Sequence, residues 1–350
     1  MKLPVTKRGM VQTALGSIFY LLNDGRNLDG NNATNSIGEK TPILCFHMSP
    51  RSSDEFLEVL PLLALGDEDD IDGRVVIAFD TPGYGASENP PRSCTIDEIS
   101  DVFLMAADSI LSETTSNGEQ QSANSSKNYV TVGSLLGNYF CVSLASRYPK
   151  RIKAGVLTNP WYNPSALDSS ASGSDATDFS DASSNAIEDS FVLKEDGSHL
   201  SDLHNKRSRW LDPELNFRVV SSEISYLVNR RKRYSNGISI QGGNTYDFLT
   251  TVQRIVEMRG ENSPDDCSNF LCIIGESCAS IFDQFGLDGT KRFDETSKML
   301  RGETGDDVTT NNNVVRVERL AGGKSTLNVV NQMPEEFAAL CNSFLSERGL

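Results

Sequence analysis

The sequence has no apolar run approaching the ~20 residues that a membrane-spanning helix needs, so it predicts no transmembrane segment. Its seven cysteines are odd in number and widely spaced, with no Cys-x-x-Cys pair. This usage does not resemble a disulfide framework and is typical of a reduced compartment. Basic residues are scarce, since 32 Lys and Arg face 48 Asp and Glu, giving a net charge of −16. Such a surface repels phosphates, which argues against nucleic acid as a partner.

We also predict no secretory signal. The stretch over 11–22 is mildly apolar and follows basic residues, but Gln12, Thr13 and Ser17 interrupt it. Because no small-residue cleavage site follows, we expect a strand at 16–22 and a cytoplasmic location.

Strand and helix patterns alternate along most of the chain. Short apolar runs typical of buried strands lie at 43–47, 75–80, 129–133, 152–157, 270–275 and 314–320. Apolar residues at helical spacing predict helices at 54–65, 96–111, 138–147 and 334–345. This alternation predicts a mostly parallel sheet with helices on both faces.

The pattern breaks after Trp161. Residues 165–190 are rich in Ser, Ala and Asp and have no basic residue, a composition that predicts disorder. Residues 191–260 have helical patterns again. The stretches 112–128 and 302–313 are rich in Ser, Asn, Gly and Thr, and we expect them to be surface insertions.

The clearest motif is a tight turn between the strand at 129–133 and the helix at 138–147. Gly133 and Gly137 have the spacing of a G-x-S-x-G nucleophile elbow, in which small residues flank a strained nucleophile. The central position, where a serine should stand, holds Leu135. The motif therefore predicts an architecture more clearly than an activity.

Other patterns accompany this turn in a fixed order. The strand at 43–47 ends in CFHM, and the next strand leads into DTPGYGAS at 80–87. RYPKRI at 147–152 follows the elbow helix, and PEEF at 334–337 opens the last helix. In this order and at these separations, the patterns resemble the α/β-hydrolase family over nearly the whole chain.

The resemblance implies an α/β-hydrolase fold: a mostly parallel central sheet flanked by helices, with a helical cap insertion. It divides the chain into an N-terminal part of the core at 1–160, a cap at 161–260 and a C-terminal part of the core at 261–350. Fold does not fix function, so the site positions are considered one by one.

The resemblance places all three triad positions on unsuitable residues. Leu135 stands at the nucleophile position, Cys278 at the acid position and Lys324 at the histidine position. Met48 replaces the glycine of the oxyanion segment, and no histidine follows His204. A triad acts as a unit, so this pattern predicts a protein without Ser-His-Asp chemistry.

Two other chemistries stay open. Ser134 would be a nucleophile in a register shifted by one, but Val132 and Leu136 would then crowd it. Cys278 is a second candidate, with Lys324 available to lower its pKa. The alternative is that Cys278 is a small buried residue and Lys324 a solvated one.

The pocket and the oxyanion region are expected to draw on a small set of residues after the strand ends. These candidates are His47, Met48, Ser134, Leu135, Leu136, Asn159 and Trp161. His47 either faces the pocket or hydrogen-bonds the backbone of the neighbouring turn.

The stretch expected to form the cap carries further candidates for metal binding, for lining a cleft and for charge contacts. His199 and His204 are five positions apart and do not share a helical face, so we predict no metal site and no cofactor. Glu223, Tyr226 and Tyr234 are candidates to line the cleft between cap and core, although no spacing pattern selects them. The basic run at 230–233 either meets an acidic group or is a solvated helix face.

Three functions are consistent with these patterns. The first is a non-catalytic pseudoenzyme whose pocket binds a small hydrophobic or ester-like ligand. The second is an active hydrolase or lyase that uses non-standard pocket residues. The third is a scaffold that binds basic partners through its acidic insertions.

Overall fold

The computed structural model describes most of the predicted core. The described residues are 4–25, 40–49, 51–65, 73–115, 127–161, 194–207, 218, 220–225, 246–261, 269–284, 288–301, 303, 315–321 and 328–350. The predicted disorder at 165–190, the basic run at 230–233, Tyr226, Tyr234 and Lys324 all lie outside these residues.

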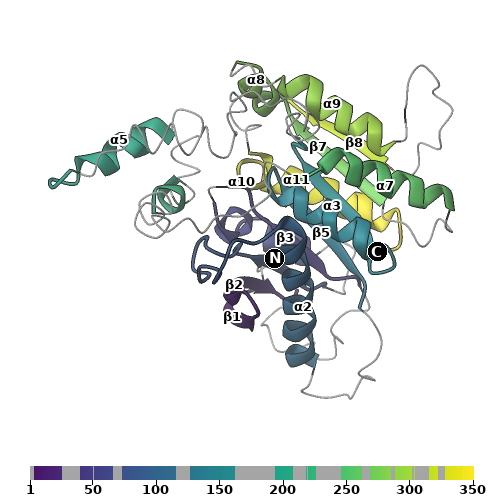
Figure 1. The fold of residues 1–350 in the computed structure, drawn as a ribbon, viewed down its shortest axis with the longest axis horizontal. Helices are drawn as coiled ribbons and strands as arrows, with labels where there is room; N and C mark the ends of the chain where they lie inside the picture. The colour runs from purple at the N-terminus through teal and green to yellow at the C-terminus, as the bar shows by residue number, and fades with distance from the viewer. Residues whose placement is uncertain are drawn as a thin grey trace.

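Eight strands form one sheet, in the spatial order β1-β2-β4-β3-β5-β6-β7-β8 (Figure 1). The strands are β1 Lys7–Thr13, β2 Gly16–Asn23, β3 Ile43–Phe46, β4 Val76–Phe79, β5 Tyr129–Ser134, β6 Ile152–Thr158, β7 Asn269–Gly275 and β8 Val315–Leu320. Strands β3 to β8 pair in parallel, and the β1–β2 hairpin joins the sheet antiparallel. The predicted mostly parallel sheet is confirmed.

Strand β1 is the strand that the apolar patterns do not predict. It lies at the sheet edge, and Val11 is its one buried side chain. An edge strand faces solvent on most sides, so its sequence lacks the apolar run of a central strand. Strands β3 and β4, in contrast, are buried at every position, as their unbroken apolar sequences require.

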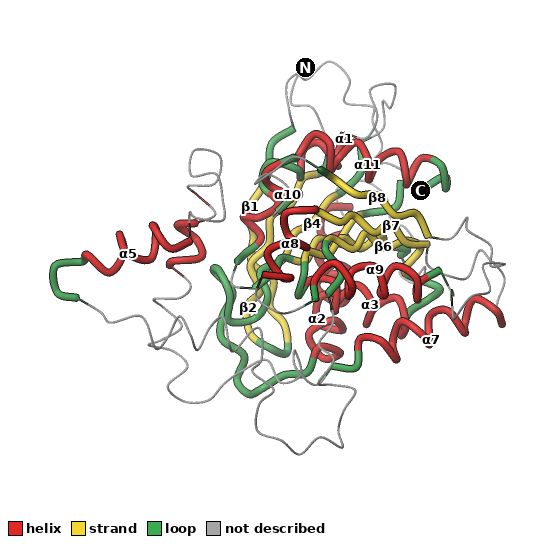
Figure 2. Tube along the Cα trace, turned by 90° about the horizontal axis from the view of Figure 1, so that it is seen from above, coloured by secondary structure: helices red, strands yellow, loops and turns green. Residues whose placement is uncertain are grey.

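Helices cover both faces of the sheet. The helices are α1 Leu60–Leu65, α2 Ile96–Thr115, α3 Gly137–Arg147, α5 Ser198–Arg207, α7 Phe248–Glu261, α8 Glu276–Gln284, α9 Gly289–Leu300, α10 Val329–Gln332 and α11 Pro334–Ser346. Figure 2 shows α1, α10 and α11 on one side of the strands and α2, α3, α7 and α9 on the other. Each layer buries its own apolar cluster against the sheet.

The predicted helix at 54–65 is only partly correct. A 3-10 turn, η1 Ser53–Phe56, comes first, and α1 starts at Leu60. Pro61 has no backbone N–H to donate, so it fits the first turn of a helix and not the middle of a longer one. The turn η1 lies between β3 and α1, and its Glu55 side chain contacts Met48, just after the carboxyl end of β3.

The predicted helix at 96–111 is confirmed and extends to Thr115. Its start is fixed by a capping box, in which the Thr95 N–H donates to Glu98 Oε2 at 2.9 Å. The Glu98 N–H donates back to Thr95 Oγ1 at 3.1 Å. The helix packs beside α3 and supports the turn that follows β5.

The stretch predicted as a cap contributes three described pieces. Helix α5 stands apart from the sheet in Figure 1, residues 220–225 form a helical turn, and α7 packs on α3 through Phe248 and Tyr139. The Phe248 and Tyr139 ring centroids are 5.1 Å apart. The domain boundaries at 160 and 260 remain predictions.

Candidate functional site

The turn between β5 and α3 has the strained backbone of a nucleophile elbow. Leu135 has a φ of 45°, in the left-handed region that non-glycine residues rarely adopt. A Cβ on Gly133 would lie 2.6 Å from Asn138 N, and one on Gly137 would lie 2.0 Å from Phe46 O. Side chains at these two positions would break the turn. The prediction that the two glycines bracket a sharp strand-to-helix turn is confirmed.

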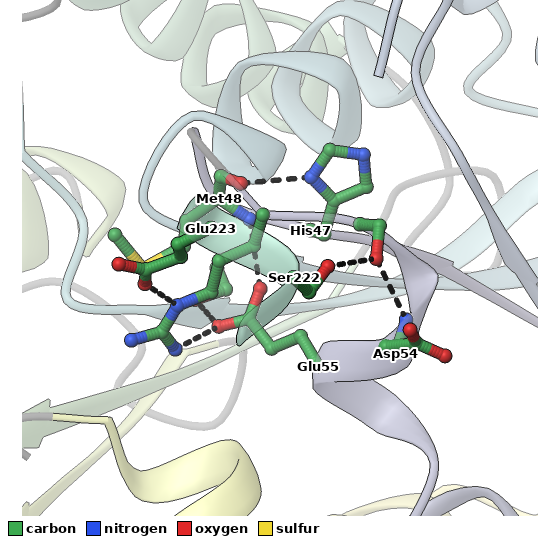
Figure 3. Close-up of polar contacts among 9 residues, drawn as sticks. His47, Met48, Asp54, Glu55, Ser222 and Glu223 are labelled. Atoms are coloured by element: carbon green, nitrogen blue, oxygen red, sulfur yellow. Dashed lines mark hydrogen bonds and ion pairs between the residues drawn. The ribbon is translucent and has the colours of Figure 1, made fainter. Parts of the chain in front are cut away.

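A buried ion-pair network lies next to this turn, at the carboxyl end of β3. The Arg51 Nε donates to Glu223 Oε1 at 2.6 Å, and the Arg51 Nη1 donates to Glu55 Oε1 at 3.2 Å. Figure 3 shows Glu55 and Glu223 around this guanidinium. The three side chains are almost entirely shielded from solvent, with 4% of the Arg51 side chain exposed and 0% of each carboxylate side chain.

The Glu55 carboxylate joins this network to the elbow. Its Oε2 accepts the Met48 N–H at 2.8 Å, and its Oε1 accepts the Ser134 hydroxyl at 3.0 Å. Met48 belongs to the segment in which the resembled enzymes keep a backbone donor for a developing oxyanion. In this protein the Met48 N–H is bonded to an internal carboxylate.

Leu135 and Cys278, the residues expected at the nucleophile and acid positions, meet at one apolar cluster. Cys278 is fully buried beside Ile274 and Phe282, and Leu135 and Trp161 pack against this cluster. Burial raises the pKa of the Cys278 thiol to about 12, although the nearby Arg51 charge acts in the opposite direction. A thiol so protonated is not a nucleophile at neutral pH.

Cys278 lies on a helix and not on a loop after β7. Helix α8 begins at Glu276, immediately after β7 ends at Gly275, so Cys278 lies in the first turn of that helix. The direct strand-to-helix junction turns the thiol into the apolar cluster. Lys324, the third triad-equivalent position, lies outside the described residues.

His47 is held by the backbone on both sides of its ring. Its Nε2 accepts the Thr81 N–H at 2.9 Å, which leaves Nδ1 to donate to the Met48 carbonyl at 2.8 Å. Burial lowers the pKa of the ring, so the imidazole is neutral and both nitrogens are occupied. His47 therefore holds the turn after β4 against the segment after β3.

Comparison with known proteins identifies the fold family. A family model described as alpha/beta hydrolase fold matches residues 41–256. The chain belongs to the α/β-hydrolase family.

Solved structures of α/β-hydrolase-type proteins share this fold. A bromoperoxidase from Bacillus anthracis is similar with a TM-score of 0.57 and 14% identity, covering 97% of this chain and all of the other. A hydrolase from Pseudomonas aeruginosa PA01 is similar with a TM-score of 0.55 and 17% identity, covering 97% and 98%. At these identities the likeness concerns the fold alone.

Curated relatives match a shorter stretch. The 1-acylglycerol-3-phosphate O-acyltransferase ABHD5 of Mus musculus is 27% identical over 135 residues, and that of Homo sapiens is 26% identical over 135 residues. The aligned stretch is 39% of this chain and 34% of either relative. The chain thus spans about a third of the length of the curated relatives it matches.

Other residues predicted for the pocket of this α/β-hydrolase hold elements of the fold together. Asn159 has a φ of 50°, and its Oδ1 accepts the Gly275 N–H at 2.8 Å, which ties the end of β6 to the end of β7. Leu136 packs on the face that carries α2 and α3. The Trp161 ring lies under the Arg292 guanidinium at 5.2 Å and meets Phe282 edge-on.

In the part of this α/β-hydrolase that the structure describes, no group of three or more His, Cys, Asp or Glu side chains is arranged to hold a metal ion. His199 and His204 both lie on α5, away from the elbow. Among the helices given above, none combines the length and the apolar character needed to cross a membrane.

The sequence patterns do not predict Arg51 or Glu55 as site residues. Apolar spacing predicts only a helix over 54–65, and that pattern gives no weight to the charged positions within it. The available signal is the i, i+4 spacing of Arg51 and Glu55 directly after the His47-Met48 segment. Glu223, which also pairs with Arg51, lies 172 positions from it in the sequence, so spacing along the chain does not reveal this contact.

Asp80 gives this site a pH-dependent stability. Its carboxylate accepts the Ser53 and Ala86 N–H groups at 2.7 Å each, yet burial dominates and raises its pKa from 3.8 to about 6. The folded protein thus holds a proton that the unfolded chain releases between these two values. The stabilisation is complete below pH 3.8 and is lost as the pH rises through about 6.

We therefore expect the Asp80 contribution to the free energy of unfolding to fall by about 2 kcal/mol between pH 4 and pH 6. Urea unfolding at several pH values, for the wild type and Asp80→Asn, measures this contribution as the pH-dependent part of their difference. Asp202→Asn removes a carboxylate whose side chain is 65% exposed and serves as the control. A difference between wild type and Asp80→Asn that stays constant from pH 4 to pH 6 would contradict the account.

Proposed function

We propose that this α/β-hydrolase is a non-catalytic member that binds a small hydrophobic or ester-like ligand between core and cap. The observation that carries the proposal is Leu135 in a nucleophile elbow whose geometry is intact. The fold retains the strained turn, with its two crowded glycines, although no reactive oxygen occupies it. A turn kept without its nucleophile supports a role in shape and binding.

The surroundings of the elbow support the same proposal. Cys278, at the acid position, is buried in the apolar cluster that Leu135 and Trp161 also contact. The Met48 N–H, which would otherwise be available to stabilise a developing negative charge, already donates to Glu55. Catalysis of acyl transfer needs donors aimed at the charge of the transition state, and this donor faces a charge that is already present.

The acyl transfer named for the curated relatives, onto 1-acylglycerol 3-phosphate, is not proposed for this chain. Their similarity covers 34% of the relative's length. Activation of an acyl group requires a nucleophile or a base at the reacting carbon. The described residues at the nucleophile and acid positions are Leu135 and Cys278.

One observation favours the alternative of an active hydrolase. Ser134 donates to the Glu55 carboxylate at 3.0 Å, the contact that a serine and a general base make. However, 2% of Ser134 is exposed, and the same carboxylate also accepts from Arg51 and from the Met48 N–H. A carboxylate shared among three donors has little capacity to draw a proton from the hydroxyl, so we place this alternative second.

The scaffold function and the cap assignment remain proposals from the sequence. The acidic stretch at 165–190 lies outside the described residues, as do most residues between 208 and 245. A cap over 161–260 remains part of the proposed architecture.

Restoring the missing oxygen tests the proposal. We expect Leu135→Ser to hydrolyse p-nitrophenyl butyrate no faster than the wild type, because the basic groups described beside the turn, Glu55 and His47, are already hydrogen-bonded. The sequence has no histidine after His204, and both ring nitrogens of His47 are already bonded. Steady-state release of p-nitrophenol measures the outcome.

Leu136→Ser is the matched control, since it makes the same change one position along the turn. A burst of p-nitrophenol from Leu135→Ser, absent in Leu136→Ser, would show that the site contains a working base. That result would favour the active-hydrolase alternative.

A further inference from the structure

Strand β1 lies at one end of the sheet and pairs with β2 alone among the described strands (Figure 1). The backbone of β2 shows which way the residues of β1 point. The N–H groups of Ser17 and Phe19 donate away from β1, to Glu88 Oε2 at 2.8 Å and to Ser87 Oγ at 2.9 Å. Their carbonyls accept from the Glu88 and Asp80 N–H groups, each at 2.9 Å. The backbones of Ser17 and Phe19 are therefore turned away from β1.

The β1 residues directly opposite these two are Gln12 and Met10. Opposed residues of an antiparallel pair either bond each other or both point away. The N–H and C=O groups of Gln12 and Met10 therefore point outward from the sheet, and those of Arg8, two positions along, point the same way. We call this row of donors and acceptors, at Arg8, Met10 and Gln12, the β1 edge.

The two ends of the sheet differ in their side chains. Charged side chains are a common device by which proteins keep edge strands from pairing. On β8, at the other end, Arg316 pairs with Glu318 and Arg319 pairs with Asp294. The β1 edge has Met10 at its centre, and this apolar residue is 51% exposed. A strand added at the β1 edge would cover Met10 and pair the outward backbone groups.

A second copy of the chain fits the β1 edge in an antiparallel register centred on Met10. In this register Met10 lies opposite Met10 of the second copy, and Arg8 lies opposite its Gln12. Every outward N–H and C=O group of the edge then has a partner. The cations of the strand do not face each other, since Lys7 lies opposite Thr13 of the second copy. A register centred on Arg8 would place two arginines directly opposite, which is destabilising.

The other face of the strand adds an apolar contact in the same register. Tyr20 of β2 covers Gly9, because a Cβ on Gly9 would lie 2.3 Å from Tyr20 Cζ. Val11 of the second copy lies opposite Gly9, which places it beside the Tyr20 ring. The joined sheet has Met10 contacts on one face and contacts of Val11 with Tyr20 on the other, and cross-strand pairs of this kind stabilise a sheet.

We propose that the chain forms a symmetric homodimer in which β1 pairs with β1 of a second copy about a two-fold axis at Met10. The two sheets become one continuous sheet, and both copies contribute the same surface, as a two-fold axis requires. A single pair of seven-residue strands is smaller than a standard interface of roughly 1,200–2,000 Å², so we expect the dimer to dissociate at micromolar concentrations. The dimer uses the sheet edge and is independent of the proposed ligand-binding function.

Sedimentation velocity over about 1–200 μM protein tests the proposal, with the wild type expected to shift from monomer to dimer. Met10→Lys and Met10→Glu each place like charges opposite each other at the axis, so each should raise the dissociation constant at least about tenfold. An equal mixture of the two variants places opposite charges at the axis and should regain the dimer. Met105→Lys changes a methionine on α2 that is 69% exposed, and its dissociation constant should match that of the wild type.

A wild type that stays monomeric over this range would overturn the proposal, including the case in which the β1 edge binds an unrelated strand. A Met10→Lys dimer as stable as the wild type, or a mixture of variants that dimerises no better than either alone, would also overturn it. Hydrogen exchange of the wild type measures the same contact without a variant. The amides of Arg8, Met10 and Gln12 should be protected only at high protein concentration, and equal exchange at both concentrations would contradict the pairing.

Discussion

Replacing Arg51 with methionine should lower the free energy of unfolding by about 3–5 kcal/mol. The substitution leaves Glu55 and Glu223 in a buried site without the guanidinium that both contact. Burying an unpaired carboxylate is unfavourable, because the charge loses its hydration and gains no compensating attraction. Urea unfolding monitored by tryptophan fluorescence measures the change.

Two control variants separate the ion-pair network from the loss of an arginine. Arg92→Met removes an arginine whose pair with Glu98 is exposed, and its stability should match the wild type within error. The triple variant Arg51→Met, Glu55→Gln, Glu223→Leu removes all three charges and should regain most of the lost stability. An Arg51→Met protein as stable as Arg92→Met would contradict the network described here.

The second large expected effect concerns catalysis. Loss of a catalytic triad lowers kcat by on the order of a million-fold and leaves only the contributions of binding and of the oxyanion hole. We expect Leu135 and Cys278 at the nucleophile and acid positions, and the Met48 amide, expected in the oxyanion segment, is bonded to Glu55. We therefore expect the wild type to hydrolyse simple esters at the uncatalysed rate.

The parallel core could be predicted because its sequence pattern is local. The strands near 43–47, 75–80, 129–133, 152–157, 270–275 and 314–320 are each a short apolar run, and each is found within a residue or two of its expected bounds. Buried parallel strands are apolar on both faces, so composition alone marks them. Strand β1 lacks this pattern because an edge strand buries little.

The elbow could be predicted because its constraint is steric. Gly133 and Gly137 must be small for the turn to form, whatever stands between them. The polar network could not be predicted in the same way. Glu223 meets Arg51 only in the folded chain, and neither charge has a local pattern that distinguishes it from a solvated residue.

The burial of Cys278 shows a further limit of sequence reasoning. The sequence allows both a reactive thiol and a packed one. The choice depends on helix α8 starting directly at the end of β7, which aims the side chain at Phe282 and Ile274. The residue at which α8 begins decides whether the Cys278 thiol is buried, and the apolar runs do not predict that residue.

The rate of p-nitrophenyl ester hydrolysis by the purified wild type tests most directly the claim that this fold is retained without its chemistry. The account predicts a rate equal to that of buffer, unchanged in Ser134→Ala and Cys278→Ala. Saturable turnover by the wild type that either alanine variant abolishes would contradict it, and would assign the reaction to that residue.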